Sequence, residues 1–307
     1  MSSISASTKE ITAILLGKTG YGKSATGNTL LGFDRFEVVR VTSMSSITKL
    51  IFYETITIDG CRWNIYDTPG LMVADKNVED IKAAVDDMSK VMRICQERNH
   101  GGIVFLLIYT INNTFSAEDR KTFEVLESIF GNRNFWKRCV LVLTKLDTLE
   151  GTFNEWLSSQ RGCFTELKAK CGGNVVAVCN QDNNDGRRTL KINTREELQQ
   201  VILRLASSGP SYTLKEYESY ENLRNNIVLE YELPSLQSKY NEEINEIREQ
   251  RLKVKRRRHR EALLQRIAIL KDRILEKDNG TGILQTFINS LDLEIQSTPN
   301  HWYFFFF

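Results

Sequence analysis

The chain has 307 residues, of which 41% are apolar, so it can bury a proper core in one or two domains. Its 41 basic and 39 acidic side chains nearly cancel, and this balance alone identifies no class of partner. The six cysteines lack a C-x-x-C spacing, no apolar stretch has the length of a membrane span, and Met-Gly is absent at the start. These absences argue against zinc or redox chemistry, a signal peptide and N-myristoylation, and they favour reduced thiols in a cytoplasmic protein.

The first predicted element is a strand over residues 11–16, followed by a glycine-rich turn and a helix. The turn fits the phosphate-binding pattern G-x-x-x-x-G-K-[ST], in which small residues let backbone NH groups surround phosphate oxygens. Lys23 adds a cation for the outer phosphates, and the Ser24 hydroxyl is placed to ligate Mg²⁺. The residues expected to bind the nucleotide here are Gly17, Lys18, Thr19, Gly20, Tyr21, Gly22, Lys23, Ser24 and Ala25.

A second predicted site segment is Asp67-Thr68-Pro69-Gly70, which follows a strand over residues 63–66. Asp67 can hold the metal through water, and the Gly70 amide can meet the γ-phosphate. Such a segment alone could equally be an ordinary turn, but here it accompanies a phosphate loop. The preceding strand, over residues 50–58, is joined to it by Asp59-Gly60, which predicts a hairpin and one antiparallel strand.

A GTPase also needs a threonine-bearing switch between the phosphate loop and Asp67. We predict Thr48 as the residue that completes the magnesium shell and senses the γ-phosphate, which makes it the candidate catalytic residue. The neighbouring alternatives are Thr42, Ser43, Ser45 and Ser46.

The base is predicted to be guanine, from Thr144-Lys145-Leu146-Asp147 after a strand over residues 140–143. The Asp147 carboxylate can accept hydrogen bonds from the N1 and N2 donors of guanine, which adenine cannot supply, and the stem of Lys145 can lie along the ring. Asn180, after a strand over residues 175–179, is the candidate that closes the base pocket. The predicted ligands are therefore GTP or GDP and Mg²⁺.

Strand patterns alternate with helical patterns through the first two hundred residues, for example over 103–108, 116–130 and 140–143. This alternation predicts an α/β fold with helices on both faces of the sheet, as in small GTPases. The expected architecture is a P-loop GTPase three-layer sandwich with a mostly parallel sheet, followed by a C-terminal helical extension.

With these residues in view, the chain resembles the immunity-associated nucleotide-binding GTPases, a family with an AIG-type, paraseptin-like G domain. The resemblance covers roughly residues 9–205 and uses an extended first box over 17–32, the segment 67–71 and Cys171-Gly172-Gly173. It also uses a block that generic GTPases lack, over 105–108, 115–119 and 129–131. The chain departs from the family pattern at two places. Ile103 occupies the position where the family usually has a histidine, and His100 is nearby but out of register. The base-reading segment 144–147 lacks an extra charged residue that the family often has. Roles given to that histidine are therefore not carried over.

Hydrolysis requires a group that orients water and a cation that meets charge in the transition state. Leu71 occupies the position of the Ras-like glutamine and can do neither. We therefore expect slow intrinsic hydrolysis that depends on a partner or a second protomer, and the resemblance implies pairing across the nucleotide face. The alternative is a GTP-loaded scaffold with negligible turnover, whose nucleotide state sets its oligomerisation.

Three parts are expected along the chain: a G domain over 9–207, a charged helical or coiled-coil extension over 211–290, and a disordered tail over 291–307. Heptad-like apolar residues predict that the extension packs on the G domain or forms a coiled coil with another copy. A basic cluster over 253–260 fits a solvated face, an anionic membrane surface or nucleic acid. The lack of an aromatic platform argues against single-stranded nucleic acid. The expected location is cytoplasmic, with peripheral membrane association as an option.

Overall fold

The computed structural model describes residues 9–37, 51–70, 78–98, 100–131, 134–209, 211–252 and 257–298. The chain divides into two compact units, Met1–Glu221 and Asn222–Phe307. The predicted switch residue Thr48, Leu71 and part of the basic cluster lie outside the described residues.

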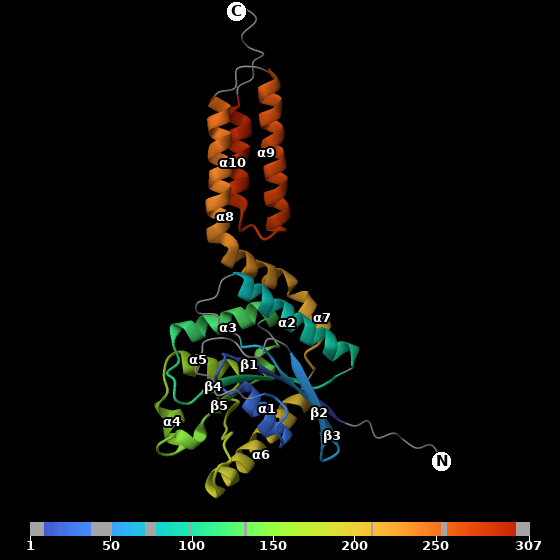
Figure 1. Ribbon diagram of the computed structural model, residues 1–307, viewed down its shortest axis with the longest axis vertical. Helices are drawn as coiled ribbons and strands as arrows, with labels where there is room; N and C mark the ends of the chain where they lie inside the picture. Colours follow the sequence, from blue (N-terminus) through green and yellow to red (C-terminus); the bar gives the residue numbers. More distant parts are fainter. Residues whose placement is uncertain are drawn as a thin grey trace, which may run out of the picture. The chain divides into compact units, whose positions relative to one another are not determined.

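The first unit is an α/β sandwich built on one sheet of six strands (Figure 1). The strands are β1 (Glu10–Gly17), β2 (Phe52–Ile58), β3 (Cys61–Asp67), β4 (Ile103–Thr110), β5 (Cys139–Thr144) and β6 (Val175–Ala177). The helices described in this unit are α1 (Lys23–Leu31), α2 (Val78–Glu97), α3 (Ala117–Phe130), η1 (Trp136–Arg138), η2 (Leu146–Thr148), α4 (Phe153–Ser159), α5 (Cys163–Lys170), α6 (Asp185–Ser207) and α7 (Leu214–Ser219).

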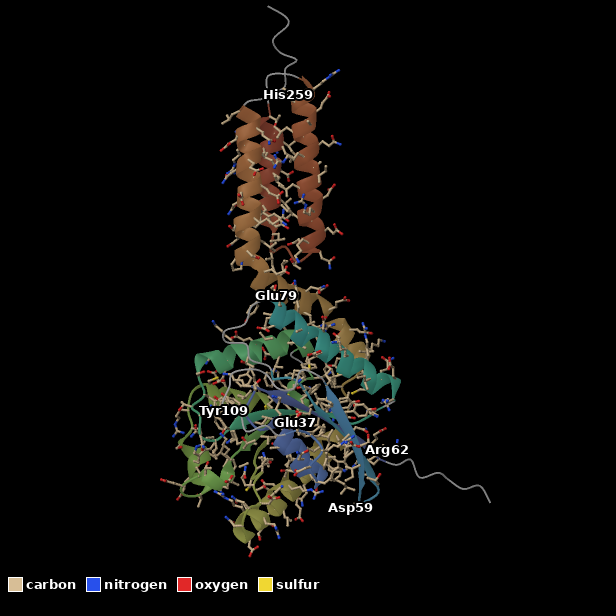
Figure 2. The ribbon with its side chains drawn as sticks, viewed as in Figure 1. Glu37, Asp59, Arg62, Glu79, Tyr109 and His259 are labelled. Atoms are coloured by element: carbon tan, nitrogen blue, oxygen red, sulfur yellow. The ribbon has the colours of Figure 1, made fainter. Side chains whose placement is uncertain are left out.

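The sheet order is β2-β3-β1-β4-β5-β6, and every pair is parallel except β2 with β3. The antiparallel pair follows from its two-residue turn, in which Asp59 has φ 49° and Gly60 has φ 73°. Two successive positive φ values match the twist of a tight hairpin, and Figure 2 shows Asp59 at its tip. The predicted hairpin and mostly parallel α/β sheet are confirmed.

Helices cover both faces of the sheet, with α1 and α6 on one side and α2 and α3 on the other (Figure 1). Because alternate residues of a strand point to opposite faces, β1 supplies Leu15 to the α1–α6 side, where it packs in one cluster with Leu30 and Leu198. On the other side Phe105 of β4 packs against Phe130 of α3 with ring centroids 4.7 Å apart. β1 and β4 are buried along nearly their whole length, which is why their sequences are continuously apolar rather than alternating.

The second unit is formed by packed helices, and those described are α8 (Glu221–Leu252), α9 (Arg257–Asp278) and α10 (Gln285–Ser297). The heptad-like residues of α8 and α9 lie in its core and are at most 4% exposed: Tyr240, Ile244, Ile247, Leu263, Ile267, Leu270 and Ile274. The sequence predicted that these heptad-like residues pack on the G domain or on another copy. In the structure they pack instead against other helices of the same unit. The turn before α10 is closed by Asp278, whose carboxylate accepts from the backbone N of Gly282 at 2.7 Å and of Leu284 at 2.7 Å.

The boundaries differ from those expected from the sequence. Residues 291–297 are the last two turns of α10, although the sequence predicted a tail from residue 291. The short helix α7, expected in the extension, belongs to the first unit, where the Tyr217 hydroxyl lies 2.8 Å from Ser89 Oγ of α2. None of the described helices is long and apolar enough to cross a bilayer.

Candidate nucleotide-binding site

The predicted site residues that the structure describes come together at one edge of the sheet. In the parallel register Leu15 pairs with Asp67, Gly17 with Ile108, and Thr110 with Thr144. The carboxyl ends of β1, β3, β4 and β5 therefore come together, which is where open parallel sheets bind ligands. The phosphate loop, Asp67 and the Thr144–Asp147 segment share this edge although they are distant in the sequence.

Close packing explains two glycines of the phosphate loop. Gly17 has φ 150°, and a Cβ there would overlap the carbonyl oxygen of Ile108. Gly22 has φ 95°, directly precedes α1, and its Cβ would lie 3.2 Å from the Cγ2 of Thr144. Only glycine adopts these conformations without strain, so the loop can wrap against β4 and β5. Thr144 closes the contact, since its hydroxyl donates to the carbonyl of Tyr21 at 2.8 Å.

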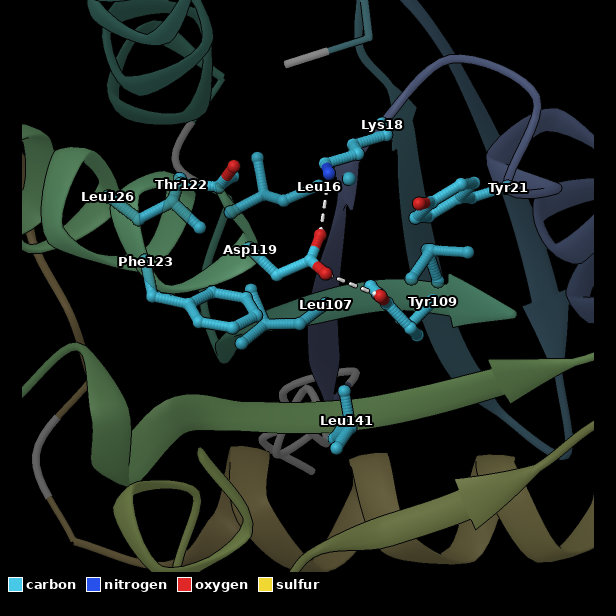
Figure 3. Close-up of a pocket in the computed structure, with 12 residues that line it drawn as sticks. Leu16, Lys18, Tyr21, Leu107, Tyr109, Asp119, Thr122, Phe123, Leu126 and Leu141 are labelled. Carbon is cyan, nitrogen blue, oxygen red and sulfur yellow. Dashed lines mark hydrogen bonds and ion pairs between the residues drawn. The ribbon is translucent and has the colours of Figure 1, made fainter. Parts of the chain in front are cut away.

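The two lysines of the loop are oriented differently. Lys23, in the first turn of α1, is 7% exposed, and its Nζ donates to the Lys18 carbonyl at 3.2 Å. The Lys18 ammonium lies 2.6 Å from Asp119 Oδ1, at the start of α3 (Figure 3). Lys23 therefore lies along the loop, whereas the side chain of Lys18 connects the loop to α3, and a phosphate contact of either lysine stays a prediction.

Asp119 is the centre of a buried polar network beside the phosphate loop. Its Oδ2 accepts from the Tyr109 hydroxyl at 2.6 Å and from the Ser116 hydroxyl and backbone N, each at 2.9 Å. Burial raises the pKa of Asp119, but the bonds from Lys18, Tyr109 and Ser116 outweigh it, so this pKa is lowered. Burial and the Asp119 carboxylate raise the pKa of Tyr109. The network borders a cavity of about 20 Å³ that is otherwise lined mainly by apolar residues (Figure 3).

Ser24 and Asp67, two of the three residues predicted to hold the metal, lie in contact with each other. The Ser24 hydroxyl donates to Asp67 Oδ2 at 2.6 Å, and Asp67 is 1% exposed. Its other oxygen, Oδ1, is buried and has no hydrogen-bond partner among the described residues. Burial raises the pKa of Asp67, against the lowering by Ser24 and by the charge of Lys23. A hydroxyl and a carboxylate with an unused oxygen fit Mg²⁺, which takes oxygen ligands and few protein groups.

The tip after Asp67 lies directly on the phosphate loop. A Cβ on Gly70 would overlap the hydroxyl oxygen of Thr19 and lie 2.7 Å from its backbone N. The Thr68 hydroxyl holds this segment by donating to the Leu15 carbonyl at 2.5 Å. Glycine at position 70 thus allows the closest approach of this segment to the loop.

At the base end, Asp147 lies in the short helix η2, which follows Lys145 in the left-handed conformation with φ 65°. The carboxylate of Asp147 is 6% exposed and lies 3.2 Å from the Nε of Arg187. Asn180 contacts α1: its Nδ2 donates to Thr26 Oγ1 at 3.1 Å, and its Oδ1 accepts from Thr29 at 2.8 Å. The described contacts of the Asn180 amide therefore connect the end of β6 to α1, and it stays a predicted base contact.

Three contributors to the site were missed in the sequence: Asp119, Tyr109 and Arg187. Asp119 belongs to a block already singled out, and the S-x-x-D spacing from Ser116 signals a helix start, which the structure confirms as a capping box. No sequence pattern indicates that Asp119 meets Lys18 or that Arg187 meets Asp147, because both contacts join separate elements.

Known proteins share both the sequence pattern and the fold. Immune-associated nucleotide-binding protein 3 of Arabidopsis thaliana is 32% identical over 52% of this chain and 46% of its own length, so the chain spans less than half of that relative. Immune-associated nucleotide-binding protein 7 of the same plant is 30% identical over 69% of this chain and 68% of its own length.

Among solved structures, a dimerisation-deficient mutant of Toc33 from A. thaliana matches with a TM-score of 0.50 at 19% identity. The match covers 66% of this chain and 87% of that one, and it shows a shared P-loop GTPase fold. The sequence profile of the AIG1 family matches residues 11–230, and the chain therefore belongs to the AIG1 family.

Proposed function

We propose that this protein binds GTP and GDP with Mg²⁺ and hydrolyses GTP slowly. The observation that carries the proposal is the approach of Asp67 to Ser24 at the head of α1, with an unused carboxylate oxygen buried beside the phosphate loop. A structural role alone does not require a buried carboxylate with an unsatisfied oxygen, because such an atom costs free energy until a ligand meets it.

The chain supplies a separate group for each part of the nucleotide. Backbone NH groups of residues 17–24 and the start of α1 face the phosphates, and Lys23 adds its charge there. Asp147 supplies the acceptors that distinguish guanine from adenine. Ser24 and Asp67 would hold the metal, which when bound offsets phosphate charge.

Slow hydrolysis is proposed from Leu71, which follows Gly70 and has no group to orient water. A cation supplied by a second protomer would raise the rate by on the order of 10³ to 10⁵. The matching Toc33 chain is a variant deficient in dimerisation, which makes dimerisation a property of that protein and supports testing it here. The second candidate is a GTP-loaded scaffold whose nucleotide controls its assembly.

Calorimetric titration of the full chain with GDP, GTP and ATP, with and without Mg²⁺, tests the binding proposal. We expect both guanine nucleotides to bind, ATP to bind far more weakly, and Lys23→Ala to lose binding while its melting temperature stays near that of the native chain. Lys215→Ala, on the exposed surface of α7, is the matched control. Equal affinity for ATP and GTP, or undiminished binding by the Lys23 variant, would contradict the assignment.

Single-turnover hydrolysis as a function of protein concentration separates the two candidates. A rate constant that rises with concentration supports hydrolysis assisted by dimerisation, and a near-zero rate constant at every concentration supports the scaffold. Cytoplasmic location and contact with an anionic membrane remain predictions from the sequence.

A further inference from the structure

We infer that Arg187 is a positioning residue for guanine recognition, which holds the Asp147 carboxylate so that both of its oxygens can meet the base. The inference rests on the proposed function, because it assigns a specificity determinant to the same site. Arg187 lies outside the segments that matched nucleotide-binding motifs, at the start of α6.

The Asp147 side chain is nearly buried, and Arg187 is the cation beside it. The carboxylate is 6% exposed, the Arg187 side chain is 35% exposed, and Nε lies 3.2 Å from Oδ2. A carboxylate removed from water in this way requires a partner before nucleotide arrives, since an unpaired buried charge is costly. Arg187 supplies that partner.

Arg187 is itself held in place by the loop that begins α6. Its backbone N donates to the Asn184 side chain at 2.8 Å, which caps the helix, and its Nη1 donates to Asn183 Oδ1 at 3.1 Å. The Arg187 carbonyl also accepts from the Cys179 thiol at 3.8 Å, next to Asn180. The guanidinium is thus fixed relative to the segment that follows β6.

The backbone around Asp147 is fixed as well, but backbone bonds do not orient a carboxylate. Leu146 N donates to the Val178 carbonyl at 3.2 Å, and Thr148 N donates to the Lys145 carbonyl at 3.0 Å. The Cys179 thiol interacts with the Asp147 carboxylate, and the ion pair with Arg187 adds the charged contact that restricts its side-chain torsions. A carboxylate has about four acceptor positions, so an ion pair at Oδ2 leaves positions for the N1–H and N2–H of guanine.

A positioning role for Arg187 can be distinguished from two other roles by the effect of its loss on nucleotide affinity. If Arg187 only stabilised the fold, its loss would weaken all purine nucleotides equally. If it competed with guanine for Asp147, its loss would strengthen GDP binding. A positioning role predicts a selective loss of the second hydrogen bond, which inosine diphosphate does not make because it lacks the exocyclic amine.

The test measures dissociation constants for GDP and inosine diphosphate with the full chain and Mg²⁺. Arg187→Gln should weaken GDP by on the order of tenfold, the scale of one hydrogen bond to a charged group, and inosine diphosphate by far less. Arg188→Gln, the exposed neighbour on the same helix, is the matched control and should leave both constants unchanged. The selectivity for GDP over inosine diphosphate is the decisive quantity.

Equal weakening of both nucleotides, no change, or tighter GDP binding would overturn the inference. If Arg187→Gln melts well below the native chain, Arg187→Lys, which keeps the charge but lacks the Nε donor, is measured for the same selectivity. Failure of the native chain to bind GDP would instead overturn the proposed function, so the two failures are distinguishable.

Discussion

Two buried aspartates, Asp278 of the helical unit and Asp67 of the first unit, differ in how their oxygens are hydrogen-bonded. In the helical unit both oxygens of Asp278 accept hydrogen bonds, from Thr281, Gly282 and Leu284, and burial is outweighed so that the pKa of Asp278 is lowered. In the first unit Asp67 keeps one oxygen without a hydrogen-bond partner among the described residues, and burial raises its pKa.

The difference fits a structural role for Asp278 and the proposed metal-binding role of Asp67. Satisfied carboxylates contribute to folding, because their buried charge is met within the chain. A carboxylate left partly unsatisfied lowers stability and is retained where a ligand completes its bonds. Asp119 is intermediate, since it lies at the site but is paired with Lys18 and hydrogen-bonded to Tyr109.

The largest expected effect comes from Asp67→Asn. We expect Mg²⁺-dependent GDP affinity to fall by about a hundredfold, the scale of losing a charge-assisted contact at the metal. Melting of the ligand-free chain should be unchanged or rise, because the variant removes a buried carboxylate that is costly to ionise. Calorimetry and thermal melting check both parts, with the exposed Asp86→Asn on α2 as control. Strong destabilisation with intact GDP binding would show that Asp67, like Asp278, has a structural role.

Asp278→Ala should show the opposite pattern. Loss of the turn before α10 leaves backbone donors unsatisfied and should lower the free energy of unfolding by about 2 kcal/mol. GDP affinity should not change, and Asp272→Ala, exposed on the same helix, should alter neither quantity. Urea denaturation followed by circular dichroism measures the stability, and a parallel GDP titration tests whether the effect stays in the helical unit.

Asp119→Asn tests whether Asp119 contributes to both stability and nucleotide binding. Without the carboxylate charge, Lys18 is released from α3 and the phosphate loop loses a support, so we expect GDP affinity to fall by about three- to tenfold. The melting temperature should also fall, because the variant removes the ion pair between Asp119 and the partly buried Lys18 ammonium. Glu124→Gln on the exposed face of α3 is the control. A change in stability with unaltered GDP affinity would show that Asp119 supports the fold and does not contribute to nucleotide binding.

The smallest effect concerns His100, a partly buried base rather than a buried acid. Its Nδ1 lies 2.9 Å from the Tyr66 hydroxyl, and burial lowers its pKa despite the opposing charge of Glu10, with Arg98 and Arg62 adding to the lowering. The unfolded chain therefore binds this proton more readily, and stability is lost as pH falls below about 6.5. The melting temperature should decrease more between pH 7.5 and 5.5 in the native chain than in His100→Gln. Equal decreases would show that His100 does not contribute.

Much of the site could be predicted because its chemistry is local. Gly17, Gly22 and Gly70 are required where the backbone has positive φ or another chain segment comes within contact, and the Asp59-Gly60 turn determines its hairpin directly. Continuous apolar runs predicted strands that the structure confirms at β1, β4, β5 and β6. The parallel connection of these strands then places Asp67 and Asp147 at one edge of the sheet.

The sequence by itself therefore predicted the phosphate loop, the hairpin and the mostly parallel sheet, and it named Asp67 and Asp147, because backbone conformation and hydrophobic periodicity depend on neighbouring residues. Only the tertiary structure decided that Lys18 pairs with Asp119, that Arg187 pairs with Asp147, and that the heptad-like seam is filled within one chain. Those contacts join elements far apart in the sequence. Their free energy depends on how deeply the groups are buried, which a local sequence pattern does not show.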